Sequence, residues 1–361
     1  MSVQFEVQPN PVPLDAAARA AVLANPVFGH VFTDHMISVD WDAGRGWHDA
    51  RLAAYAPMLV DPASVVLHYG QTVFEGLKAY RQPDGGVALF RPERNAERLT
   101  RSCLRLALPT FPEQSFVEAC ELLVRTDAGW VPEGEGASLY LRPFIWATEV
   151  GLGVRPSSSA RFQVIASPAG NYFSGALRPV SLWLSQEYTR SAPGGTGAAK
   201  CGGNYAASLV AQQEAAAHGC DQVVFLDAVE RRWLEELGGM NIFLVLDDGT
   251  LVTPELSGTI LEGITRDSVI TLAREQGHRV EQRRVDVDEW RKGAVDGSVV
   301  EVFACGTAAV ITPIGALRWP GDEVVAGSGE PGPVTMALRS ALLDVQYGRA
   351  DDPHGWMHHV L

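Results

Sequence analysis

Short apolar runs separated by glycine-containing turns recur along the whole chain. The runs "VALF" (87–90), "QVVFL" (222–226), "ASLYLRPFIWATEVGLGV" (137–154) and "RFQVIASPAG" (161–170) have the length and alternation typical of strands. The segment "ASVVLHY" (63–69) predicts a further strand, which continues through Gly70 into a second apolar segment. The pattern therefore predicts strands in both halves of the chain.

Helical periodicity appears between these runs. In "RPERNAERLTRSCLRLALP" (91–109), Ala96, Leu99 and Cys103 recur at helical spacing, and Pro109 ends the pattern. A second helix is predicted from about Tyr205 to His218, with Gly219 as a left-handed cap, and a third in "TRDSVITLAREQG" (265–277). Helices and strands intermixed in this way predict a mixed α/β (α+β) fold.

Two segments in the second half predict pairs of adjacent strands. "NIFLVLDDGTLVTP" (241–254) is typical of a hairpin on an Asp-Gly turn, and "VVEVFACGTAAVITPI" (299–314) of strand, turn and strand. The 361 residues exceed the size at which one hydrophobic core stops growing. We therefore predict an N-terminal domain (1–173), a linker (174–179) and a C-terminal domain (180–361).

Composition narrows the class of protein. With 46% hydrophobic and 20% charged residues the chain is expected to fold, and its net charge of −14 disfavours nucleic acid and anionic membranes as partners. Its five cysteines are widely spaced, and its N-terminus has no signal-peptide pattern. No run approaches a membrane span, and no histidine pair has metal-ligand spacing in a structured context. We expect a cytoplasmic small-molecule protein with reduced thiols and no metal.

A single lysine, Lys200, lies between two glycine-rich stretches in "GGTGAAKCGGNYAASL" (194–209). Glycines would let a planar ligand approach the backbone, and desolvation would lower the pKa of the amine and make it a nucleophile toward an aldehyde such as pyridoxal phosphate. A surface lysine in a flexible loop is the alternative. A phosphate-binding loop is excluded because Ala199 and Cys201 replace the required glycine and hydroxyl residue.

The chain resembles the class IV aminotransferases of pyridoxal-phosphate fold type IV, specifically the branched-chain amino acid aminotransferases. The resemblance rests on ordered motifs along nearly the whole chain: "FGHVFTDHM", "LHYGQTVFEGLKAY", "LFRPERNAERL", "LYLRPF", "SPAGNYF", "KCGGNYAASL", "EELGGMNIF", "EGITRDSV" and "GTAAVITPI". It implies a smaller N-terminal α/β domain, a larger C-terminal domain, and a cofactor at the domain interface. It also implies a homodimer in which a loop containing Leu152 and Val154 covers the partner's pocket.

The resemblance assigns the cofactor contacts. Lys200 would hold pyridoxal 5′-phosphate through a Schiff base and later move the Cα proton. Strand alternation allows only one of Glu235 and Glu236 to face the pyridine nitrogen; the family spacing selects Glu236, and Glu235 is taken as solvated. The phenolic oxygen would contact Tyr205. The phosphate would be bound by Arg98, Ile264, Thr265 and Thr307.

The resemblance also assigns the substrate contacts. A branched aliphatic side chain needs an apolar and aromatic pocket, and the family pattern implies one lined by Phe28, Tyr69, Phe74, Tyr140 and Tyr172. Arg142 would bind the distal carboxylate of 2-oxoglutarate, and the amides of Thr307 and Ala308 the α-carboxylate. Some relatives have a redox Cys-x-x-Cys where this chain has Ala309 and Thr312, so no thiol switch is expected there.

The expected activity is reversible transfer of the amino group of L-leucine, L-isoleucine or L-valine to 2-oxoglutarate, which gives glutamate and a branched keto acid. A D-amino acid aminotransferase and aminodeoxychorismate lyase, the enzyme that forms aminobenzoate, are alternatives within the fold. A non-catalytic pyridoxal-phosphate-binding protein is an alternative of another class. The order of preference among the three substrates stays open, because one methyl group changes discrimination by only about 1–3 kcal/mol.

Overall fold

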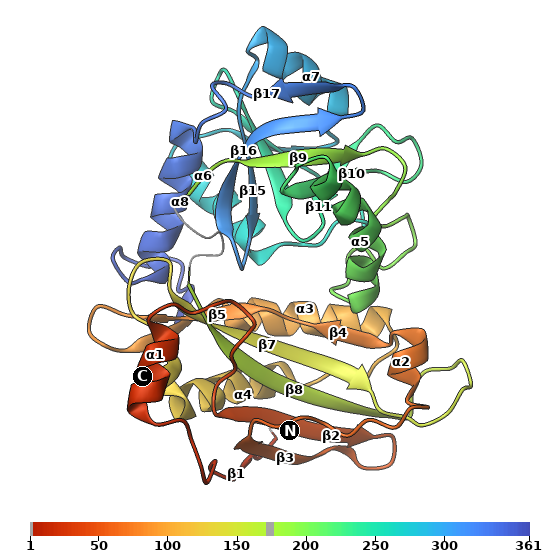
Figure 1. Ribbon diagram of the computed structural model, residues 1–361, viewed down its shortest axis with the longest axis vertical. Helices are drawn as coiled ribbons and strands as arrows, with labels where there is room; N and C mark the ends of the chain where they lie inside the picture. Colours follow the sequence, from red (N-terminus) through yellow and green to blue (C-terminus); the bar gives the residue numbers. More distant parts are fainter. Residues whose placement is uncertain (1–2, 171–176) are drawn as a thin grey trace. The chain divides into compact units, whose positions relative to one another are not determined.

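The computed structural model describes residues 3–170 and 177–361, and the chain forms two compact units. Unit 1 comprises Met1–Tyr172, Ala199–Gly202 and Val345–Leu361; unit 2 comprises Phe173–Ala198 and Gly203–Asp344. Each unit contains one large sheet with its own helices (Figure 1).

Unit 1 contains a sheet that is antiparallel except where its short first strand joins. Its order is β1-β3-β2-β8-β7-β5-β6-β18, and β4 pairs with β7. The strands are β1 (Glu6–Val7), β2 (His35–Asp42), β3 (Gly46–Ala54), β4 (Thr72–Phe74), β5 (Leu77–Arg81), β6 (Val87–Phe90), β7 (Ser138–Ala147), β8 (Ser159–Ala169) and β18 (Met357–His359). The helices are α1 (Ala16–Leu23), α2 (Val65–Tyr69), α3 (Pro92–Arg105), α4 (Glu113–Thr126) and the 3-10 turn η1 (Ala128–Trp130).

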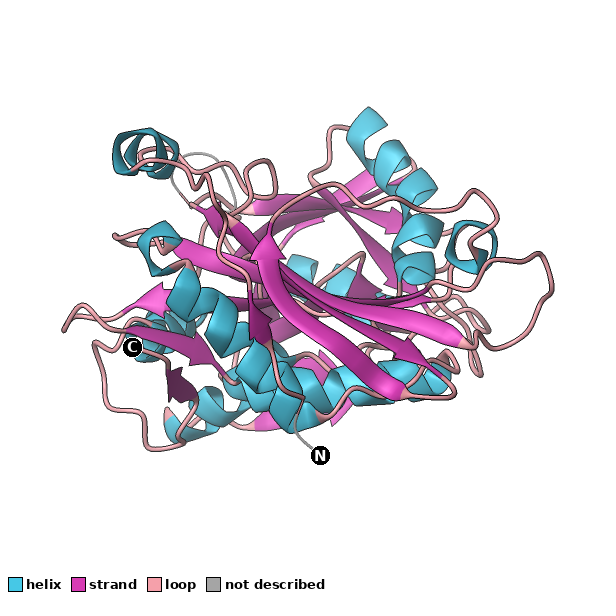
Figure 2. Cartoon of the chain, turned by 90° about the horizontal axis from the view of Figure 1, so that it is seen from below, coloured by secondary structure: helices cyan, strands magenta, loops and turns pink. Residues whose placement is uncertain are grey.

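The core of unit 1 lies where α3 and α4 pack on the sheet (Figure 1). The predicted helical positions Ala96, Leu99 and Cys103 are buried there. Phe162 of β8 stacks on Phe111 with ring centroids 4.0 Å apart. The sheet has the strand twist expected from the chirality of L-residues (Figure 2).

The prediction of a strand at 63–69 is wrong. Residues Val65–Tyr69 form the short helix α2, which Gly70 ends in the left-handed conformation with φ 60°. Only Val65 is buried in this helix, and a five-residue apolar run is too short to distinguish a period of 3.6 from a period of 2. The strand that follows Gly70 is present as β4.

Unit 2 contains a mixed sheet of order β11-β10-β9-β16-β15-β12-β13-β14, with β17 paired to β16. Its strands are β9 (Val180–Ser185), β10 (Gln222–Leu226), β11 (Leu234–Leu237), β12 (Asn241–Leu246), β13 (Leu251–Pro254), β14 (Val280–Arg283), β15 (Val299–Gly306), β16 (Val310–Trp319) and β17 (Asp322–Val325). The remaining helices are α5 (Gly202–Ala217), α6 (Ile264–Glu275), α7 (Val287–Asp296) and α8 (Pro333–Gln346), of which α5 and α8 each extend into unit 1 at one end.

Most predicted elements of this unit are confirmed. The hairpin β12–β13 turns at Gly249, whose φ is 81°, and β15 pairs with β16 around the predicted turn. Helix α5 starts three residues before its predicted beginning, and Gly219 is left-handed as expected. One face of β9 and β10 packs on α5 through Trp183 and Phe225.

Neither unit is one continuous stretch of the chain. The short segment 199–202 and the C-terminal segment 345–361 belong to unit 1, and the residues between them belong to unit 2. The predicted division at 174–179 stays a prediction, and residues 174–176 of that linker lie outside the described residues.

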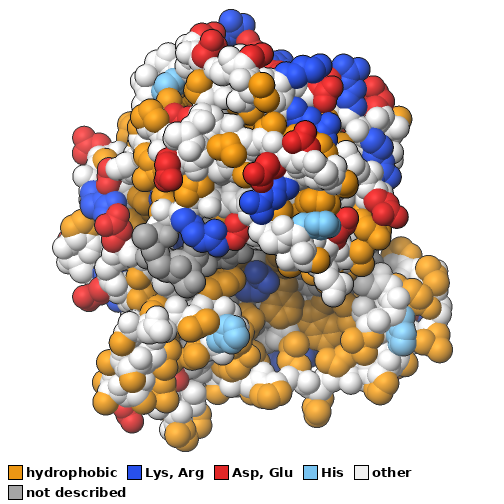
Figure 3. All heavy atoms as spheres, turned by 45° about the horizontal axis from the view of Figure 1, so that its top comes forward, with side chains coloured by type: hydrophobic (Ala, Val, Ile, Leu, Met, Phe, Trp, Pro, Cys, Tyr) orange, Lys and Arg blue, Asp and Glu red, His pale blue; other side chains and the backbone are white. Residues whose placement is uncertain are grey.

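The surface carries charges of both signs. On the face in Figure 3, acidic and basic side chains are interspersed with hydrophobic ones. Among residues 3–170 and 177–361, no helix is long and apolar enough to cross a membrane. The same residues contain no cluster of three or more His, Cys, Asp or Glu side chains that could hold a metal ion.

Candidate active site

The backbone around Lys200 is fixed on both sides by unit 1. The Phe74 amide donates to the Lys200 carbonyl at 2.9 Å, and the Lys200 amide donates to Ser102 Oγ at 2.9 Å. The next residue, Cys201, forms an antiparallel bridge with Val73 of β4. The alternative of a lysine in a flexible loop is therefore wrong, because the glycine-rich sequence is paired to a strand where the lysine occurs.

The Lys200 amine lies against an aromatic face. Its Nζ atom is 4.8 Å from the centroid of the Phe74 ring, and the side chain is half-buried. A cation in that position is attracted by the ring, while partial burial removes some of its hydration.

A buried ion pair next to β4 supports this region. Arg98 of α3 donates from Nε to Glu75 Oε1 and from Nη2 to Glu75 Oε2, both at 2.8 Å, and Asn95 donates to Oε2 at 2.7 Å. Burial raises the pKa of Glu75, but Arg98, Lys200 and Asn95 together outweigh it, so the pKa lies below its ordinary value. Arg98 is only 4% exposed, in contrast to a solvated basic helix face.

Three of the predicted substrate aromatics and Arg142 form one group in unit 1. Phe28 meets Tyr140 edge to face at 4.9 Å between centroids, and the Arg142 guanidinium lies 4.8 Å from the Phe74 centroid. Arg142 Nη2 also donates to the Tyr140 hydroxyl at 3.3 Å. Arg142 Nε is buried and has no hydrogen-bond partner among the described residues, so this guanidinium retains donor capacity.

Tyr69 and the loop residues Leu152 and Val154 lie in a separate part of the surface of unit 1. Tyr69 is exposed, and its hydroxyl donates to the Leu152 carbonyl at 2.6 Å. Leu152 and Val154 are 67% and 82% exposed. Tyr172 lies outside the described residues.

In unit 2, Glu236 of β11 is a buried carboxylate held by three donors. The Leu261 amide donates to Oε1 at 2.7 Å, Arg190 Nη2 lies 2.5 Å from Oε1, and Asn241 Nδ2 donates to Oε2 at 3.4 Å. Arg190 also donates to the carbonyls of Gly197 and Thr259. These contacts fix the orientation of Glu236.

The start of α6 lies close to this carboxylate. The Asn241 amide that reaches Glu236 also donates to the Leu261 carbonyl, three residues before Ile264. A Cβ on Gly263, the residue preceding the helix, would lie 2.0 Å from Asn241 Oδ1, so only glycine fits. The first turn has no side-chain cap, which leaves the amides of Ile264 and Thr265 to bind an anion.

The turn that contains Thr307 and Ala308 follows β15, which pairs with β12 so that Cys305 is opposite Asn241. Both turn residues are half-buried. The Tyr205 ring is 3.5 Å from the Cβ that Gly239 would carry if it were alanine. The predicted residues Tyr205, Glu236, Ile264, Thr265, Thr307 and Ala308 all belong to unit 2.

The expectation that Glu235 is solvated is wrong. Glu235 is 4% exposed and accepts a hydrogen bond from Thr259 Oγ1 at 2.5 Å. The alternation of side chains along a strand correctly predicts that Glu235 and Glu236 point in different directions and have different partners. It cannot show whether another segment of the chain covers the face on which Glu235 lies.

Sequence reasoning missed three contributors to these arrangements: Glu75, Gly76 and Arg190. Glu75 had a signal, because it is a charged residue inside the apolar run "TVFEGLKAY". Gly76 is required because a Cβ there would lie 1.9 Å from the Tyr140 hydroxyl. Arg190 had no signal, since "EYTRSAPGG" shows no periodicity that predicts burial.

Comparison with known proteins identifies the family. The model of the family "Amino-transferase class IV" matches residues 72–317. A protein of Streptomyces coelicolor, named probable branched-chain-amino-acid aminotransferase, is 58% identical over 98% of both chains. The crystal structure of the Escherichia coli branched-chain amino acid aminotransferase is 32% identical, with a TM-score of 0.75 over 90% of this chain and 99% of its own.

A second solved structure extends the agreement. The branched-chain amino acid aminotransferase of Thermobaculum terrenum, in its PLP holo-form, is 27% identical with a TM-score of 0.73. It covers 93% of this chain and 99% of its own. Sequence and architecture agree, and the chain belongs to the class IV aminotransferases, in the group of the branched-chain amino acid aminotransferases.

Proposed function

We propose that this protein is a pyridoxal-phosphate-dependent branched-chain-amino-acid transaminase, which exchanges the amino group of L-leucine, L-isoleucine or L-valine with 2-oxoglutarate in either direction. Its family membership supports the reaction class. The observation that carries the assignment to this chain is the Lys200 amine, anchored through its backbone and held over Phe74.

The residues present fit pyridoxal phosphate. Unit 1 supplies a primary amine on an aromatic face, as a covalently held aldehyde requires. Unit 2 supplies a buried carboxylate, Glu236, and an uncapped helix start at Ile264 that can receive a phosphate. When bound, the cofactor supplies a protonated pyridine ring that withdraws electrons from the Cα–H bond of the substrate.

Each proposed role is the one that the family resemblance implies, and it suits the chemistry of the side chain. Lys200 Nζ would hold the cofactor through its aldehyde carbon and would move the Cα proton of the substrate as general base and then acid. Glu236 would accept a hydrogen bond from the pyridine N–H and favour its protonated form. Tyr205 would donate to the phenolic oxygen, and Ile264, Thr265, Thr307 and Arg98 would hold the phosphate.

The substrate roles rest on the aromatic group in unit 1. Phe28, Phe74 and Tyr140 offer apolar surface to a branched side chain, together with Tyr69 and Tyr172. Arg142, with donor capacity left at Nε, binds the distal carboxylate of 2-oxoglutarate. The amides of Thr307 and Ala308 bind the α-carboxylate, and Leu152 and Val154 cover the pocket of a second subunit.

The decisive experiment measures transamination and also identifies the residue that carries the cofactor. The purified protein is expected to convert L-leucine and 2-oxoglutarate to glutamate, and borohydride reduction followed by peptide mapping to place the pyridoxyl group on Lys200. Lys200→Ala should lose at least about 10⁴-fold in turnover, the upper end of what general acid–base catalysis contributes, with an unchanged circular dichroism spectrum. Label on another residue, or turnover of D-alanine but not L-leucine, contradicts the proposal.

A homodimer and a cytoplasmic location stay predictions. Light scattering of the active holoenzyme tests the first, because a mass near that of one 38.9 kDa chain at full activity contradicts a dimer.

A further inference from the structure

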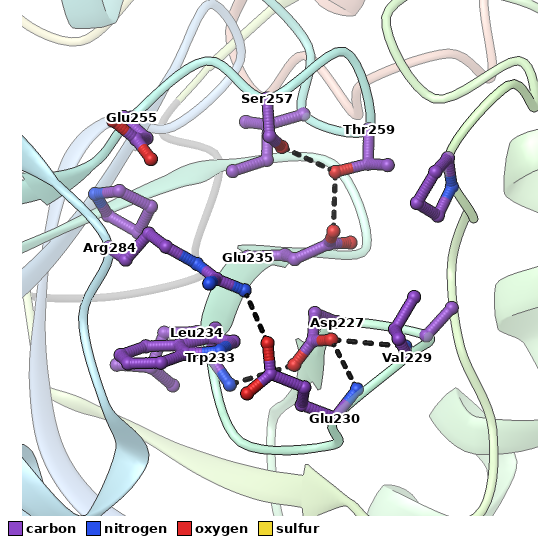
Figure 4. A pocket seen from close by; sticks show the side chains of 14 residues that line it. Asp227, Val229, Glu230, Trp233, Leu234, Glu235, Glu255, Ser257, Thr259 and Arg284 are labelled. Atoms are coloured by element: carbon purple, nitrogen blue, oxygen red, sulfur yellow. Dashed lines mark hydrogen bonds and ion pairs between the residues drawn. The ribbon is translucent and has the colours of Figure 1, made fainter.

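A pocket of about 220 Å³ lies in unit 2, and Glu235 is one of its lining residues (Figure 4). Strand β11 turns Glu236 toward Asn241 and Leu261, and Glu235 toward Thr259 and this pocket. The pocket is therefore separate from the Glu236 site, although the two carboxylates are neighbours in sequence.

The buried carboxyl group of Glu235 is only half satisfied. Its Oε1 accepts from Thr259 Oγ1, which in turn contacts Ser257 Oγ at 2.6 Å (Figure 4). Its Oε2 is buried and has no hydrogen-bond partner among the described residues. Buried polar atoms are nearly always paired, so an oxygen left in this state beside a pocket indicates a missing donor.

Three of the four other charged groups that line the pocket are already engaged. Asp227 accepts from the amides of Val229, Glu230, Arg232 and Trp233. Arg284 pairs with Glu230 at 3.0 Å and lies 4.2 Å from the Trp233 ring centroid. Glu255 adds an exposed carboxylate. The lining itself has four carboxyl groups and one guanidinium. The Arg232 guanidinium also lies 4.8 Å from the Trp233 ring centroid, and the carboxyl groups still outnumber the guanidinium groups, which favours a cation.

The remaining walls are apolar. Pro193, Val229, Leu234, Pro254 and Ile260 line the pocket together with the indole of Trp233. Hydrocarbon surface around one unpartnered acceptor is the arrangement expected for a small molecule with an apolar body and a charged donor.

We infer that this pocket binds a small organic ammonium ion, whose N–H group donates to Glu235 Oε2 and whose hydrocarbon part lies against Leu234, Ile260 and Trp233. Burial, the largest influence, raises the pKa of the Glu235 carboxyl, and a bound cation would favour its ionised form. The inference does not depend on transaminase activity, because Glu235 lies outside the residues proposed for that reaction.

N-Methylpyrrolidinium chloride is a suitable probe for isothermal titration calorimetry on the holoenzyme. As a protonated tertiary amine it still donates one N–H, but it forms neither an imine nor an iminium ion with an aldehyde, so a signal from the amine-reactive site is avoided. We expect saturable binding with a Kd on the order of 1 mM, as its few atoms allow. Cyclopentanol and cyclopentanecarboxylate, which match its ring but are neutral and anionic, should bind at least 10-fold more weakly.

Two variants test the place of binding. Glu235→Gln removes the charge, and Val229→Trp fills the exposed edge of the pocket without altering its buried wall; each should weaken binding at least 10-fold. Glu330→Gln, an exposed glutamate of the same unit outside the pocket, should leave binding unchanged. Unchanged binding in the Val229→Trp variant, or equal binding of cyclopentanol, overturns the inference even if Glu235→Gln folds poorly.

Discussion

At Gly76 the absence of a side chain determines where the Tyr140 ring can lie. A Cβ at this position would lie 1.9 Å from the Tyr140 hydroxyl and 2.7 Å from Cζ of the ring. Because Tyr140 also meets Phe28 and accepts from Arg142, the glycine sets the geometry of the whole aromatic group.

The variant Gly76→Ala should therefore move Tyr140 and, with it, Arg142. We expect the KM for 2-oxoglutarate to rise by about 10-fold or more, as happens when a bidentate carboxylate contact is misaligned, and the KM for leucine to rise less. Steady-state kinetics with each substrate varied separately measure both constants.

The matched control is the double variant Gly76→Ala/Tyr140→Phe. Removing the hydroxyl removes the shortest contact but leaves the ring, so the KM for 2-oxoglutarate should recover in part. A double variant that is no better than Gly76→Ala would show that the clash is not the cause.

Loss of either member of the Glu75–Arg98 ion pair should lower the free energy of unfolding of the protein. Removing one member leaves a buried charge without its counterion, which costs about 3–5 kcal/mol. Arg98→Met should lower the free energy of unfolding by that amount in urea titrations of the cofactor-free protein, and Glu75→Leu/Arg98→Met should recover most of it. Equal losses in the single and double variants would refute this coupling.

The same ion pair should make the stability of the folded protein decrease at acidic pH. Because the pKa of Glu75 is lowered in the folded protein, its contribution is complete above the pKa of an unfolded glutamate, near 4.3, and disappears as pH falls through the lower folded value. Glu75→Gln should lack this part of the acid dependence when unfolding is followed between about pH 5 and pH 2.

At the residue scale, sequence singled out Lys200 and Glu236 because each belongs to a distinctive local pattern, and their roles stay predictions. It was wrong about the burial of Glu235 and missed Glu75, since both are charged residues whose burial depends on segments distant in sequence: Thr259 for the first and Arg98 for the second. A local pattern contains no information about such partners.

Among the elements, α8 begins with an unusual cap. Glu301 of β15, a buried residue, accepts from the amides of Val334 and Thr335 at 3.0 and 2.8 Å and from Thr335 Oγ1 at 2.7 Å. A Cβ on Gly332 would lie 2.0 Å from the Glu301 carboxyl carbon, so the glycine allows the carboxylate to reach the helix start.

Glu301→Ala should destabilise the protein by about 1–3 kcal/mol, because it leaves buried helix-start donors without an acceptor that also suits the helix dipole. Chemical denaturation measures the loss. The exposed Glu330→Gln should change stability by less than about 0.5 kcal/mol, and an equal effect of the two substitutions would exclude a capping role.

The type of an element could be predicted from the sequence where the segment was long enough to show its hydrophobic period. Helix α3 has an apolar stripe over 14 residues, and the β12–β13 hairpin has a turn that needs a positive φ at Gly249. Helix α2 has neither, and its type is decided by Gly70 in the left-handed conformation and by what its single buried side chain contacts.

For the whole molecule, the cysteines give a prediction about reactivity. All five are free and buried. Burial raises the pKa of Cys103 and Cys305 to about 12 and that of Cys120 still further, so these thiols stay protonated at pH 8.

Iodoacetamide should therefore leave activity unchanged over an hour at pH 8, with less than about one thiol modified per chain by mass spectrometry, whereas all five should react in denaturant. Rapid native labelling of Cys103 or Cys305 would contradict their protection. Labelling restricted to Cys201, beside the lysine, would not affect this prediction for the other thiols.

The pairing of segments that are distant in the chain could not be predicted from the sequence. Chain order suggests one cut between two halves, but β18 near the C-terminus pairs with β6, and Cys201 pairs with Val73. Such long-range pairings depend on three-dimensional complementarity that no window along the chain contains.

The excursion of residues 199–202 into unit 1 constrains how this protein can be dissected. A gene truncated after codon 173 would encode neither Lys200 nor β18, the strand that pairs with β6. A chimaera that exchanges one unit with a homologue must keep these four residues and the C-terminal segment together with unit 1. Otherwise Lys200 would come from one protein and the residues that bond its backbone, Phe74 and Ser102, from the other.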